Sequence, residues 1–362
     1  MRKLHAIGVT ILFLALAGTF VRTNAQITTP RTPSPAASVT QTIGISTVTV
    51  NYSRPSVKGR EIWGKLVPYG LNSQNFGNGN PAPWRAGANE NTTIKFSHDA
   101  KVEGKPVPAG EYGLFFVVNA DNTGELILSK DNRSWGSFFY QPEHDLIHAK
   151  IQLREVPFTE MLTYDFMNST KNSSELVLNW EKKQFPVKIE FDVDNIVLAN
   201  ATEELKGPTG FSWQGYASAA AYALQAKTNY EQALKWADQA IAINPSFTAL
   251  NVKSNILRAM DKTAEADNIF NDAVAVASET ELNTYAYQLL GAGQQDKAIE
   301  MFVLNTKRFP KSANCFDSLG EALATKGDKK NAIVNFKKSL SMNPPPNVRA
   351  NSEKFLKQLG AL

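Results

Sequence analysis

The chain has 362 residues, of which 43% are hydrophobic and 20% are charged, and its formal net charge is +4. This length allows about two domains, and the apolar content is enough for packed cores, so wholesale disorder is excluded. The single cysteine, Cys315, excludes an internal disulfide and the paired cysteines of a zinc site.

The first 25 residues have the pattern of a secretory signal peptide. Arg2 and Lys3 precede an almost uncharged stretch over residues 4–20, and small residues end the segment at Ala25. We expect cleavage after Ala25; an uncleaved N-terminal anchor is the alternative. The apolar stretch is shorter than the ~20 residues that span a membrane, and no later segment is long and apolar enough. The sequence therefore predicts an exported protein, periplasmic or extracellular, with no membrane span after cleavage.

Cleavage would leave the chain almost neutral. Without Arg2, Lys3 and Arg22, 35 basic residues face 34 acidic ones. This balance argues against a general nucleic-acid-binding protein, which carries a basic patch or stripe. No cysteine lies near Ala25, which excludes a lipid anchor at the cleavage site.

Residues 26–37 are rich in Pro, Thr and Ser and predict a flexible leader. Over residues 38–193 apolar and polar residues alternate, as at Val48, Val50 and Tyr52. Many short strands at even spacing predict an antiparallel β-sandwich or barrel-like domain. The strands are expected at residues 42–52, 91–97, 112–119, 125–130, 147–156, 160–168, 175–181 and 185–192. A short helix is expected at 60–67 and a long loop at 70–83.

Residues 211–346 have a helical pattern that repeats. The repeat is marked by alanines 33, 32 and 34 residues apart, namely Ala233, Ala266, Ala298 and Ala332. Four residues after each alanine stand Ala237, Phe270, Phe302 and Phe336. A proline follows three of the four copies by twelve residues, and the second copy lacks it.

A period of about 34 residues with these marks resembles the tetratricopeptide (TPR) family. The resemblance implies an α-solenoid of four TPR repeats over residues 211–346, with a C-terminal capping helix in 347–362. A generic helical bundle is the alternative. Residues 194–210 are expected to be a linker with a short helix at 202–206.

The stretch from Tyr52 to Thr93 is unusually rich in arginine and tryptophan. Tryptophan can stack on a sugar ring or an apolar face, and arginine can bind a carboxylate or phosphate through two hydrogen bonds. The alternative is structural, with Arg85 paired to Glu90 and the tryptophans closing the end of the sandwich. The candidate ligand-binding residues are Arg54, Arg60, Trp63, Trp84, Arg85, Asn89 and Glu90.

The same stretch resembles the domain-of-unknown-function family 2911, which is found in exported bacterial proteins. The resemblance covers about residues 38–193 and includes the hairpin 102–115 and, more weakly, the Trp180-Glu181 pair. The loop 70–83 separates its two arginine-tryptophan runs. The family has no established activity, so the resemblance implies a domain and supplies no mechanism.

A second candidate site is the concave face of the TPR repeats. Asparagines on neighbouring first helices can hydrogen-bond a peptide backbone, and tyrosines supply rigid contact area. The set lacks the several lysines that would bind a peptide C-terminus, so an extended or helical segment of a partner is the expected ligand. The alternative is that the inner face is merely polar and binds nothing. The candidate residues are Tyr222, Asn251, Asn255, Arg258, Asn283, Tyr287, Asp317 and Glu321.

Enzyme signatures are missing from the sequence. It has no Gly-x-Ser-x-Gly, no phosphate-binding loop, no His-Glu-x-x-His and no dinucleotide glycine run. His144 and His148 could form half a metal site on a helix, but the pattern there is a strand, on which they would lie ~13 Å apart. No cofactor and no metal are therefore expected.

The sequence thus predicts an exported, non-enzymatic interaction scaffold that binds a protein or peptide through the TPR groove. The alternative is a glycan- or small-ligand-binding module centred on the arginine-tryptophan stretch. A third reading, an unrecognised hydrolase, would use Glu90, Asp99 or Glu111 and requires two carboxylates ~5–10 Å apart.

Overall fold

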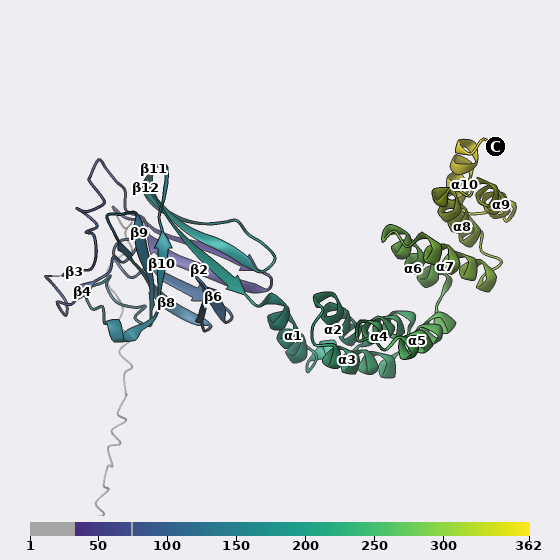
Figure 1. The fold of residues 1–362 in the computed structure, drawn as a ribbon, viewed down its shortest axis with the longest axis horizontal. Helices are drawn as coiled ribbons and strands as arrows, with labels where there is room; N and C mark the ends of the chain where they lie inside the picture. The colour runs from purple at the N-terminus through teal and green to yellow at the C-terminus, as the bar shows by residue number, and fades with distance from the viewer. Residues whose placement is uncertain (1–32, 74) are drawn as a thin grey trace, which may run out of the picture. The chain divides into compact units, whose positions relative to one another are not determined.

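The structure is a computed structural model that describes residues 33–73 and 75–362. The predicted signal peptide and most of the predicted leader lie outside the described residues. The chain divides between Phe191 and Asp192 into two compact units. The first unit is built of strands and the second of helices (Figure 1). The expected fold class, an antiparallel β domain followed by a helical-repeat domain, is confirmed.

The β unit contains two main sheets in which every pairing is antiparallel. In neighbour order, the six-stranded sheet is β1 (Ala36–Ile43), β2 (Ser46–Ser53), β5 (Thr93–Phe96), β8 (Gly110–Val118), β9 (Thr123–Ser129) and β10 (Asp145–Gln152). The four-stranded sheet is β11 (Arg154–Met167), β12 (Ser173–Phe191), β6 (Ala100–Val102) and β7 (Lys105–Val107). The shorter elements are β3 (Asn72–Ser73), β4 (Pro81–Ala82) and the 3-10 helix η1 (Pro142–His144).

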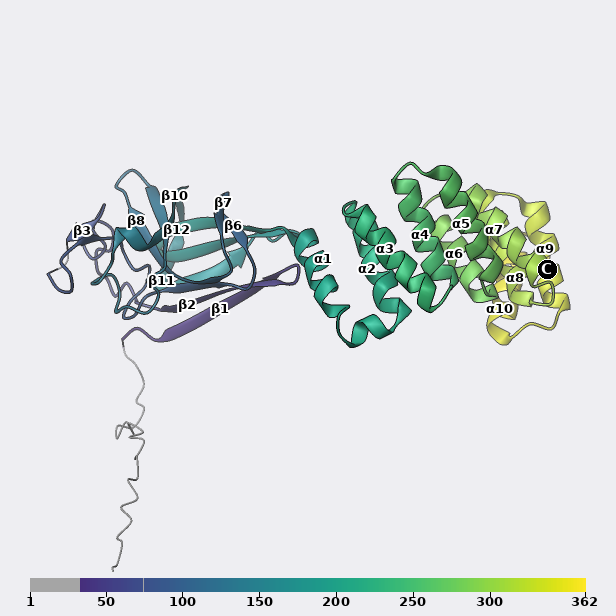
Figure 2. The same cartoon turned by 90° about the horizontal axis from the view of Figure 1, so that it is seen from below.

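The two sheets pack face to face and form a sandwich (Figure 2). Phe116 on β8 and Phe185 on β12 have ring centroids 4.9 Å apart, and both side chains are almost fully buried. Tyr52 on β2 and Tyr164 on β11 have ring centroids 4.7 Å apart. Burying these faces together removes apolar surface from water, which is the main favourable term in folding. Neither sheet closes on itself into a barrel.

Three local predictions in the β unit were wrong. The expected strand 42–52 is part of a hairpin, β1 and β2, which turns at Gly44 with φ of 61°. The two expected strands 175–181 and 185–192 are one strand, β12, with Glu181 in the left-handed region. Residues 60–67 form turns and an isolated bridge between Trp63 and Val67, not a helix.

The corrections share a physical cause: single residues decide where the backbone leaves a regular conformation. Gly64, within the expected helix, has φ of 81°, which an α-helix of L-residues does not accommodate. A side chain at Gly64 would also meet the ring of Tyr69 at 2.7 Å. The segment therefore folds as a compact loop on the sandwich.

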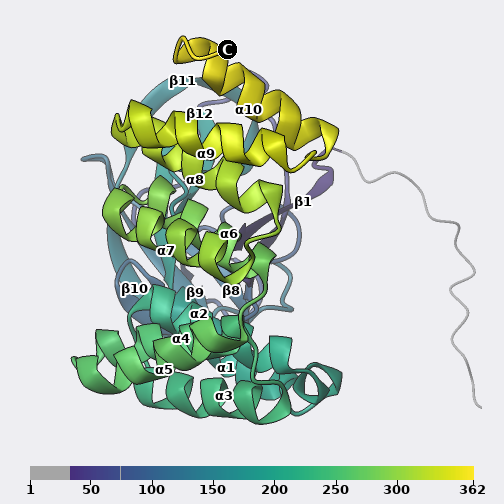
Figure 3. The ribbon, with the colours of Figure 1, turned by 90° about the vertical axis from the view of Figure 1, so that its right-hand side faces the viewer.

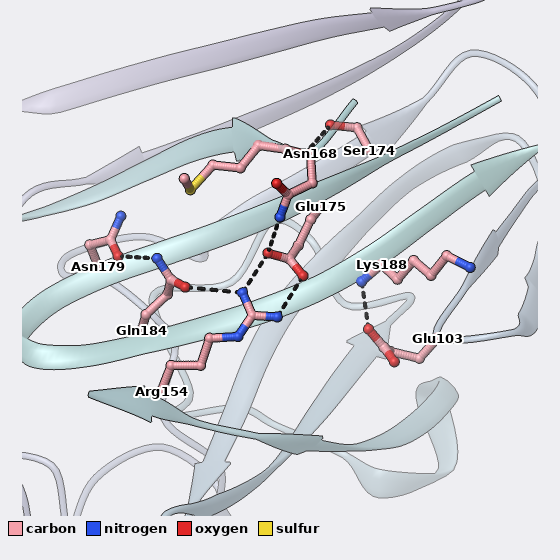
Figure 4. A network of polar contacts seen from close by, with 9 residues as sticks. Glu103, Arg154, Asn168, Ser174, Glu175, Asn179, Gln184 and Lys188 are labelled. Carbon is pink, nitrogen blue, oxygen red and sulfur yellow. Dashed lines mark hydrogen bonds and ion pairs between the residues drawn. The ribbon is translucent and has the colours of Figure 1, made fainter. Parts of the chain in front are cut away.

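Between β11 and β12 of the four-stranded sheet, Arg154 is the centre of a network of polar contacts (Figure 4). Arg154 donates from Nη1 and Nη2 to the two carboxylate oxygens of Glu175, at 2.6 and 2.8 Å. Arg154 also donates to Gln184 at 3.2 Å, and Asn168 donates to Glu175 at 3.3 Å. The hydrogen bonds from Arg154 hold the pKa of Glu175 below its usual value. The charge of Arg154 is thus neutralised by a carboxylate of the same unit.

The second unit consists of α1 and the 3-10 helix η2 followed by nine helices, most of which form antiparallel pairs (Figure 3). The helices are α1 (Val193–Glu204), α2 (Trp213–Ala226), α3 (Tyr230–Ile243), α4 (Phe247–Ala259), α5 (Thr263–Val276), α6 (Glu279–Gly291), α7 (Gln295–Arg308), α8 (Ala313–Lys326), α9 (Lys329–Ser341) and α10 (Pro346–Gln358). The segment expected as a linker contains most of α1 and the 3-10 helix η2 (Pro208–Phe211). Among the helices of the described residues, none has the length and apolarity to cross a membrane.

The repeat alignment predicts which positions of the helical unit are buried. All four marker alanines, at 233, 266, 298 and 332, are fully buried. Phe302 and Phe336, four residues after the last two, are fully buried as well. Gly320 on α8 faces the Phe336 ring so closely that a Cβ there would lie 2.9 Å from it. Small residues therefore stand where two helices cross and the aromatic residues fill the neighbouring space.

The second repeat, which lacks the proline, joins the third differently from the other junctions. Only Ala277 and Ser278 separate α5 from α6, and Ser278 begins α6 with a capping box closed by Glu281. Helix α6 makes little backbone contact with α4 and α5. Tyr285 spans this junction, since its ring lies 5.5 Å from that of Phe247 and 5.7 Å from that of Phe270. The solenoid is therefore least tightly packed between its second and third repeats.

Candidate functional site

The arginine-tryptophan stretch lines a cavity of about 450 Å³ in the β unit, which we call the cationic cavity. The loops between β2 and β5 form most of its wall, and β12 contributes Trp180. Its volume falls within the range of about 300–1,000 Å³ that is usual for small-molecule sites. It is lined by Pro33, Ser34, Pro55, Ser56, Lys58, Arg60, Leu66, Val67, Trp84, Arg85, Gly87, Ala88, Asn89 and Trp180.

Two guanidinium groups of this cavity are held by backbone carbonyls. Arg60 donates from Nε to the carbonyl of Val57 at 3.0 Å and from Nη2 to the carbonyl of Ser56. Arg85 donates from Nη1 to the carbonyl of Asn89 at 2.7 Å. A carbonyl fixes the position of a guanidinium group but does not neutralise its charge.

Arg85 is packed into the sandwich as well as lining the cavity. Its guanidinium carbon lies 5.1 Å from the centre of the Phe138 ring, and a Cβ added at Gly136 would lie 2.2 Å from that carbon. Burial lowers the pKa of Arg85 from its usual value.

The apolar wall of the cavity belongs to an aromatic cluster. The rings of Trp84 and Trp180 stack with centroids 5.7 Å apart and planes 17° apart. Trp63 packs edge-on against both, and Phe185 lies beneath Trp63 and Trp84. Trp180 is 1% exposed, and its indole N–H has no hydrogen-bond acceptor in the described part of the chain. Trp84 and Trp180 thus line the cavity and belong to the aromatic cluster at the same time.

Backbone strain is concentrated around the cavity. Lys58, Ala86 and Asn89 have φ of 48°, 51° and 63°, in the left-handed region that L-residues rarely adopt. Gly87 has no room for a side chain, since a Cβ there would lie 2.6 Å from the hydroxyl oxygen of Thr92. Such conformations cost free energy and tend to occur at functional sites.

The structure brings together four of the seven predicted residues: Arg60, Trp84, Arg85 and Asn89. Arg54 lies outside the cavity and donates to the carbonyl of Leu162 at 3.0 Å and to the hydroxyl of Thr163 at 2.6 Å, between the two sheets. Trp63 lies beside the cavity, where its indole N–H donates to Glu181 at 3.2 Å.

Sequence reasoning missed Lys58 and Trp180 as lining residues. The sequence held a signal for each of them. Lys58 lies in the first arginine-tryptophan run, and the Trp180-Glu181 pair is part of the resemblance to family 2911. Their convergence could not be seen, because β12 meets these loops only in the folded sandwich.

Glu90 lines a different cavity of about 700 Å³, together with Glu111 and Arg133. The hydroxyl of Thr93 donates to Glu111 at 3.0 Å. Asp99, the third carboxylate of the hydrolase reading, lies outside this cavity and accepts a hydrogen bond from the Ala109 N–H at 2.7 Å. Two of the three carboxylates, Glu90 and Glu111, thus line the same cavity, and Asp99 lies apart from them.

Seven of the eight predicted groove residues of the helical unit form two columns on the first helices of the repeats, and Arg258 belongs to neither column. The first column is Asn251, Asn283 and Asp317, at equivalent positions of successive repeats. The amide oxygens of Asn251 and Asn283 are buried and have no hydrogen-bond donor in the described residues. Asp317 differs, because it accepts hydrogen bonds from Ser352 and from Asn351, the latter at 2.9 Å. Burial raises the pKa of Asp317.

The second column lies one turn further along the same helices, at Tyr222, Asn255, Tyr287 and Glu321. The hydroxyl of Tyr287 donates to Glu321 at 3.1 Å, which links neighbouring repeats. The hydroxyl of Tyr222 donates to Asp194 at 2.8 Å, and burial raises the pKa of Tyr222 to about 12. Several members of the second column therefore hold the helices together.

The loose junction between the second and third repeats opens two cavities. One, of about 230 Å³, lies between α4 and α6 and is lined by Asn251, Phe247 and Tyr285 among others. The other, of about 590 Å³, is lined by Asn255 and Arg258 together with residues of α5, α6 and α7. Arg258 is paired there with Asp267 at 2.8 Å and lies over the Phe270 ring. Residues of both predicted columns thus reach the same junction.

The histidines and the cysteine have local partners. His148 contacts Asp145 at 3.0 Å and Glu125 at 3.2 Å, and His144 contacts Asp131 at 2.9 Å. Within residues 33–73 and 75–362, no group of three or more His, Cys, Asp or Glu side chains is placed to hold a metal. Cys315 is buried on α8, and burial raises the pKa of its thiol to about 11, which keeps the thiol protonated at neutral pH.

Comparison with protein-family models matches both units. Residues 34–189 match the family described as protein of unknown function DUF2911. We call the segment 34–189 the DUF2911 domain after this match. Residues 313–346 match the tetratricopeptide repeat, and this match spans α8 and α9. The cationic cavity therefore lies in the DUF2911 domain and the two columns lie in the TPR unit.

No curated protein matches this chain. Similar solved structures include the crystal structure of MamA, with 17% identity, a TM-score of 0.26, and coverage of 42% of this chain and 89% of MamA. The crystal structure of YrrB, described as a TPR protein with an unusual peptide-binding site, has 17% identity and a TM-score of 0.26. The match covers 44% of this chain and 84% of YrrB. A Pseudomonas aeruginosa pilF structure has 22% identity and a TM-score of 0.26, and the match covers 42% of this chain and 71% of pilF.

Proposed function

We propose that this chain is an exported, non-enzymatic interaction scaffold whose TPR unit binds an internal segment of a partner protein. The observation that carries the proposal is the pair of unsatisfied amide oxygens of Asn251 and Asn283 at equivalent positions of α4 and α6. A buried polar atom without a partner costs roughly 1–3 kcal/mol. Backbone N–H groups of a bound segment would supply the missing donors.

The loose junction supports the same position for the partner. The cavity between α4 and α6 contains Asn251 and is walled by the rings of Phe247 and Tyr285. An apolar side chain of the partner would occupy it while the neighbouring backbone reaches the asparagines. Asp317 stands at the equivalent position of the fourth repeat, where it already accepts hydrogen bonds from Ser352 and Asn351. The proposed site therefore ends before the fourth repeat.

Partner binding is tested by replacing both asparagines. We expect Asn251→Ala with Asn283→Ala to weaken partner capture from the envelope fraction by about 5- to 150-fold, since two hydrogen bonds contribute roughly 1–3 kcal/mol. The matched control is Asn268→Ala with Asn271→Ala, two exposed asparagines on α5. Capture would be measured by quantitative mass spectrometry of pull-downs. An identical set of captured proteins with the double variant and wild type would contradict the proposal.

Export is the second part of the proposal, and the N-terminal pattern of Arg2, Lys3 and the apolar stretch supports it. We expect the mature chain to begin at Gln26. N-terminal sequencing of the protein purified from its native envelope checks this. A chain that retains residues 1–25 in the cytoplasmic fraction would contradict export.

A second function is favoured by the cationic cavity. We propose that the DUF2911 domain binds a small ligand there, with Trp84 as one wall and Arg60 as a polar contact. The support is the cavity volume together with the positively charged lining residues Lys58, Arg60 and Arg85. Ligand binding should change tryptophan fluorescence, and Trp84→Ala should remove most of that change.

A further inference from the structure

The cationic cavity carries positive charge that the fold does not neutralise. Among its described lining residues are Lys58, Arg60 and Arg85, and there is no aspartate or glutamate. Arg60 and Arg85 use neutral carbonyls as acceptors, whereas Arg154 in the same unit is paired with the two oxygens of Glu175. The arginines of the cavity thus remain available to an anion that enters it.

Two carboxylates close to the cavity have other hydrogen-bond partners. Glu160 accepts the backbone N–H of Lys58 at 2.9 Å and does not line the cavity. Glu181 accepts the indole N–H of Trp63 at 3.2 Å and the backbone N–H of Lys182 at 2.6 Å. Neither carboxylate forms an ion pair with Lys58, Arg60 or Arg85 in the described residues. The positive charge is therefore a property of the cavity itself.

The remainder of the wall is flat and apolar. Trp84 is half-buried and stacks on the buried Trp180, so the ring of Trp84 is fixed in orientation before any ligand arrives. Leu66, Val67 and Pro55 line the same space. A fixed indole ring beside apolar side chains suits a ligand with a ring of its own.

We propose that the cationic cavity binds a small ring compound that carries a carboxylate or a phosphate group. The anion contacts Arg60 and Lys58, and the ring lies against Trp84. This inference rests on the proposed ligand-binding function of the DUF2911 domain and names the charge class of its ligand.

The test uses three probes that share one ring and differ in charge: glucuronate, glucose 6-phosphate and glucose. Each is titrated into the full chain while tryptophan fluorescence and binding heat are recorded. We expect the two anions to bind at least about tenfold more tightly than glucose, because charge-assisted hydrogen bonds are the strong ones. Raising the salt from about 0.1 M to about 1 M shortens the Debye length from about 10 Å to about 3 Å and should weaken anion binding.

Variants locate the anion. Arg60→Gln and, separately, Lys58→Gln should each weaken anion binding, by about tenfold or more for Arg60→Gln. Both side chains are exposed, so the variants should fold, which their melting curves check. The matched control is Arg133→Gln, an exposed arginine of the same domain that lies outside the cavity. It should bind like wild type.

The outcomes separate the inference from the function on which it rests. Binding of both anions that Arg60→Gln weakens and Arg133→Gln does not would support the inference. Binding of glucose as tight as that of the anions would overturn the charge class while leaving ligand binding in place. Unchanged anion affinity in both Arg60→Gln and Lys58→Gln would overturn the site. No response to any probe in the wild-type chain would count against both the inference and the ligand-binding function.

Discussion

Replacing Phe302 with alanine is expected to lower the free energy of unfolding of the TPR unit by about 3–5 kcal/mol. Phe302 on α7 is fully buried in a cluster with Ala298, Leu319 and Leu323, and its ring lies 4.9 Å from that of Tyr287. The substitution removes an aromatic ring from the space between the third and fourth repeats. The neighbouring helices cannot fully close the gap, so a cavity cost adds to the lost burial.

The measurement is urea unfolding of the full chain followed by the helical circular dichroism signal. Phe211→Ala is the matched control, because Phe211 belongs to the same unit and is 86% exposed. We expect its effect to stay within about 0.5 kcal/mol. Equal unfolding midpoints for Phe302→Ala and Phe211→Ala would contradict the burial of Phe302 between the third and fourth repeats.

Replacing Trp180 with alanine is expected to destabilise the DUF2911 domain by about 3–5 kcal/mol. Trp180 is 1% exposed and packs against the rings of Trp63 and Trp84, so its loss removes the centre of the aromatic cluster. Trp180→Phe should cost less, because it keeps part of the ring contact and removes an indole N–H that has no acceptor.

Thermal melting of the β unit within the full chain, followed by tryptophan fluorescence, checks this order. Trp135→Ala serves as the control, since Trp135 is 51% exposed in the same domain. We expect Trp135→Ala to melt close to wild type and Trp180→Phe to lie between Trp135→Ala and Trp180→Ala. If Trp180→Phe were as damaging as Trp180→Ala, the indole N–H would have a partner that stabilises the fold.

The helical unit was predictable to individual residues because its signals are local and repeated. An alanine at each helix crossing recurs at a nearly constant spacing, with an aromatic residue one turn later in three of the four repeats, and the structure buries the alanines completely. The looser junction after the second repeat was only partly visible, as a missing proline. Its two cavities depend on how α6 packs against α4 and α5, which no local pattern encodes.

In the β unit, alternation predicted strands but not their limits. The hairpin at Gly44 and the continuous strand β12 differ from the expected boundaries because a turn or a bulge depends on one residue in the left-handed region. The helix expected at 60–67 failed for the same reason, at Gly64. The candidate residues of the cationic cavity were found by residue type, since arginine and tryptophan are uncommon in loops without a role.

The sequence by itself determined the order of the two units, the repeat period of the helices and the chemical character of the loop between β2 and β5. Those properties follow from neighbours along the chain, through side-chain periodicity and residue type. The tertiary structure alone decided that Trp180 joins Trp84, that Arg54 and Glu90 lie apart from Arg60, and that Asp317 is satisfied while Asn251 is not. These outcomes depend on which distant surfaces meet when apolar faces are buried together, and that is settled only when the whole chain packs.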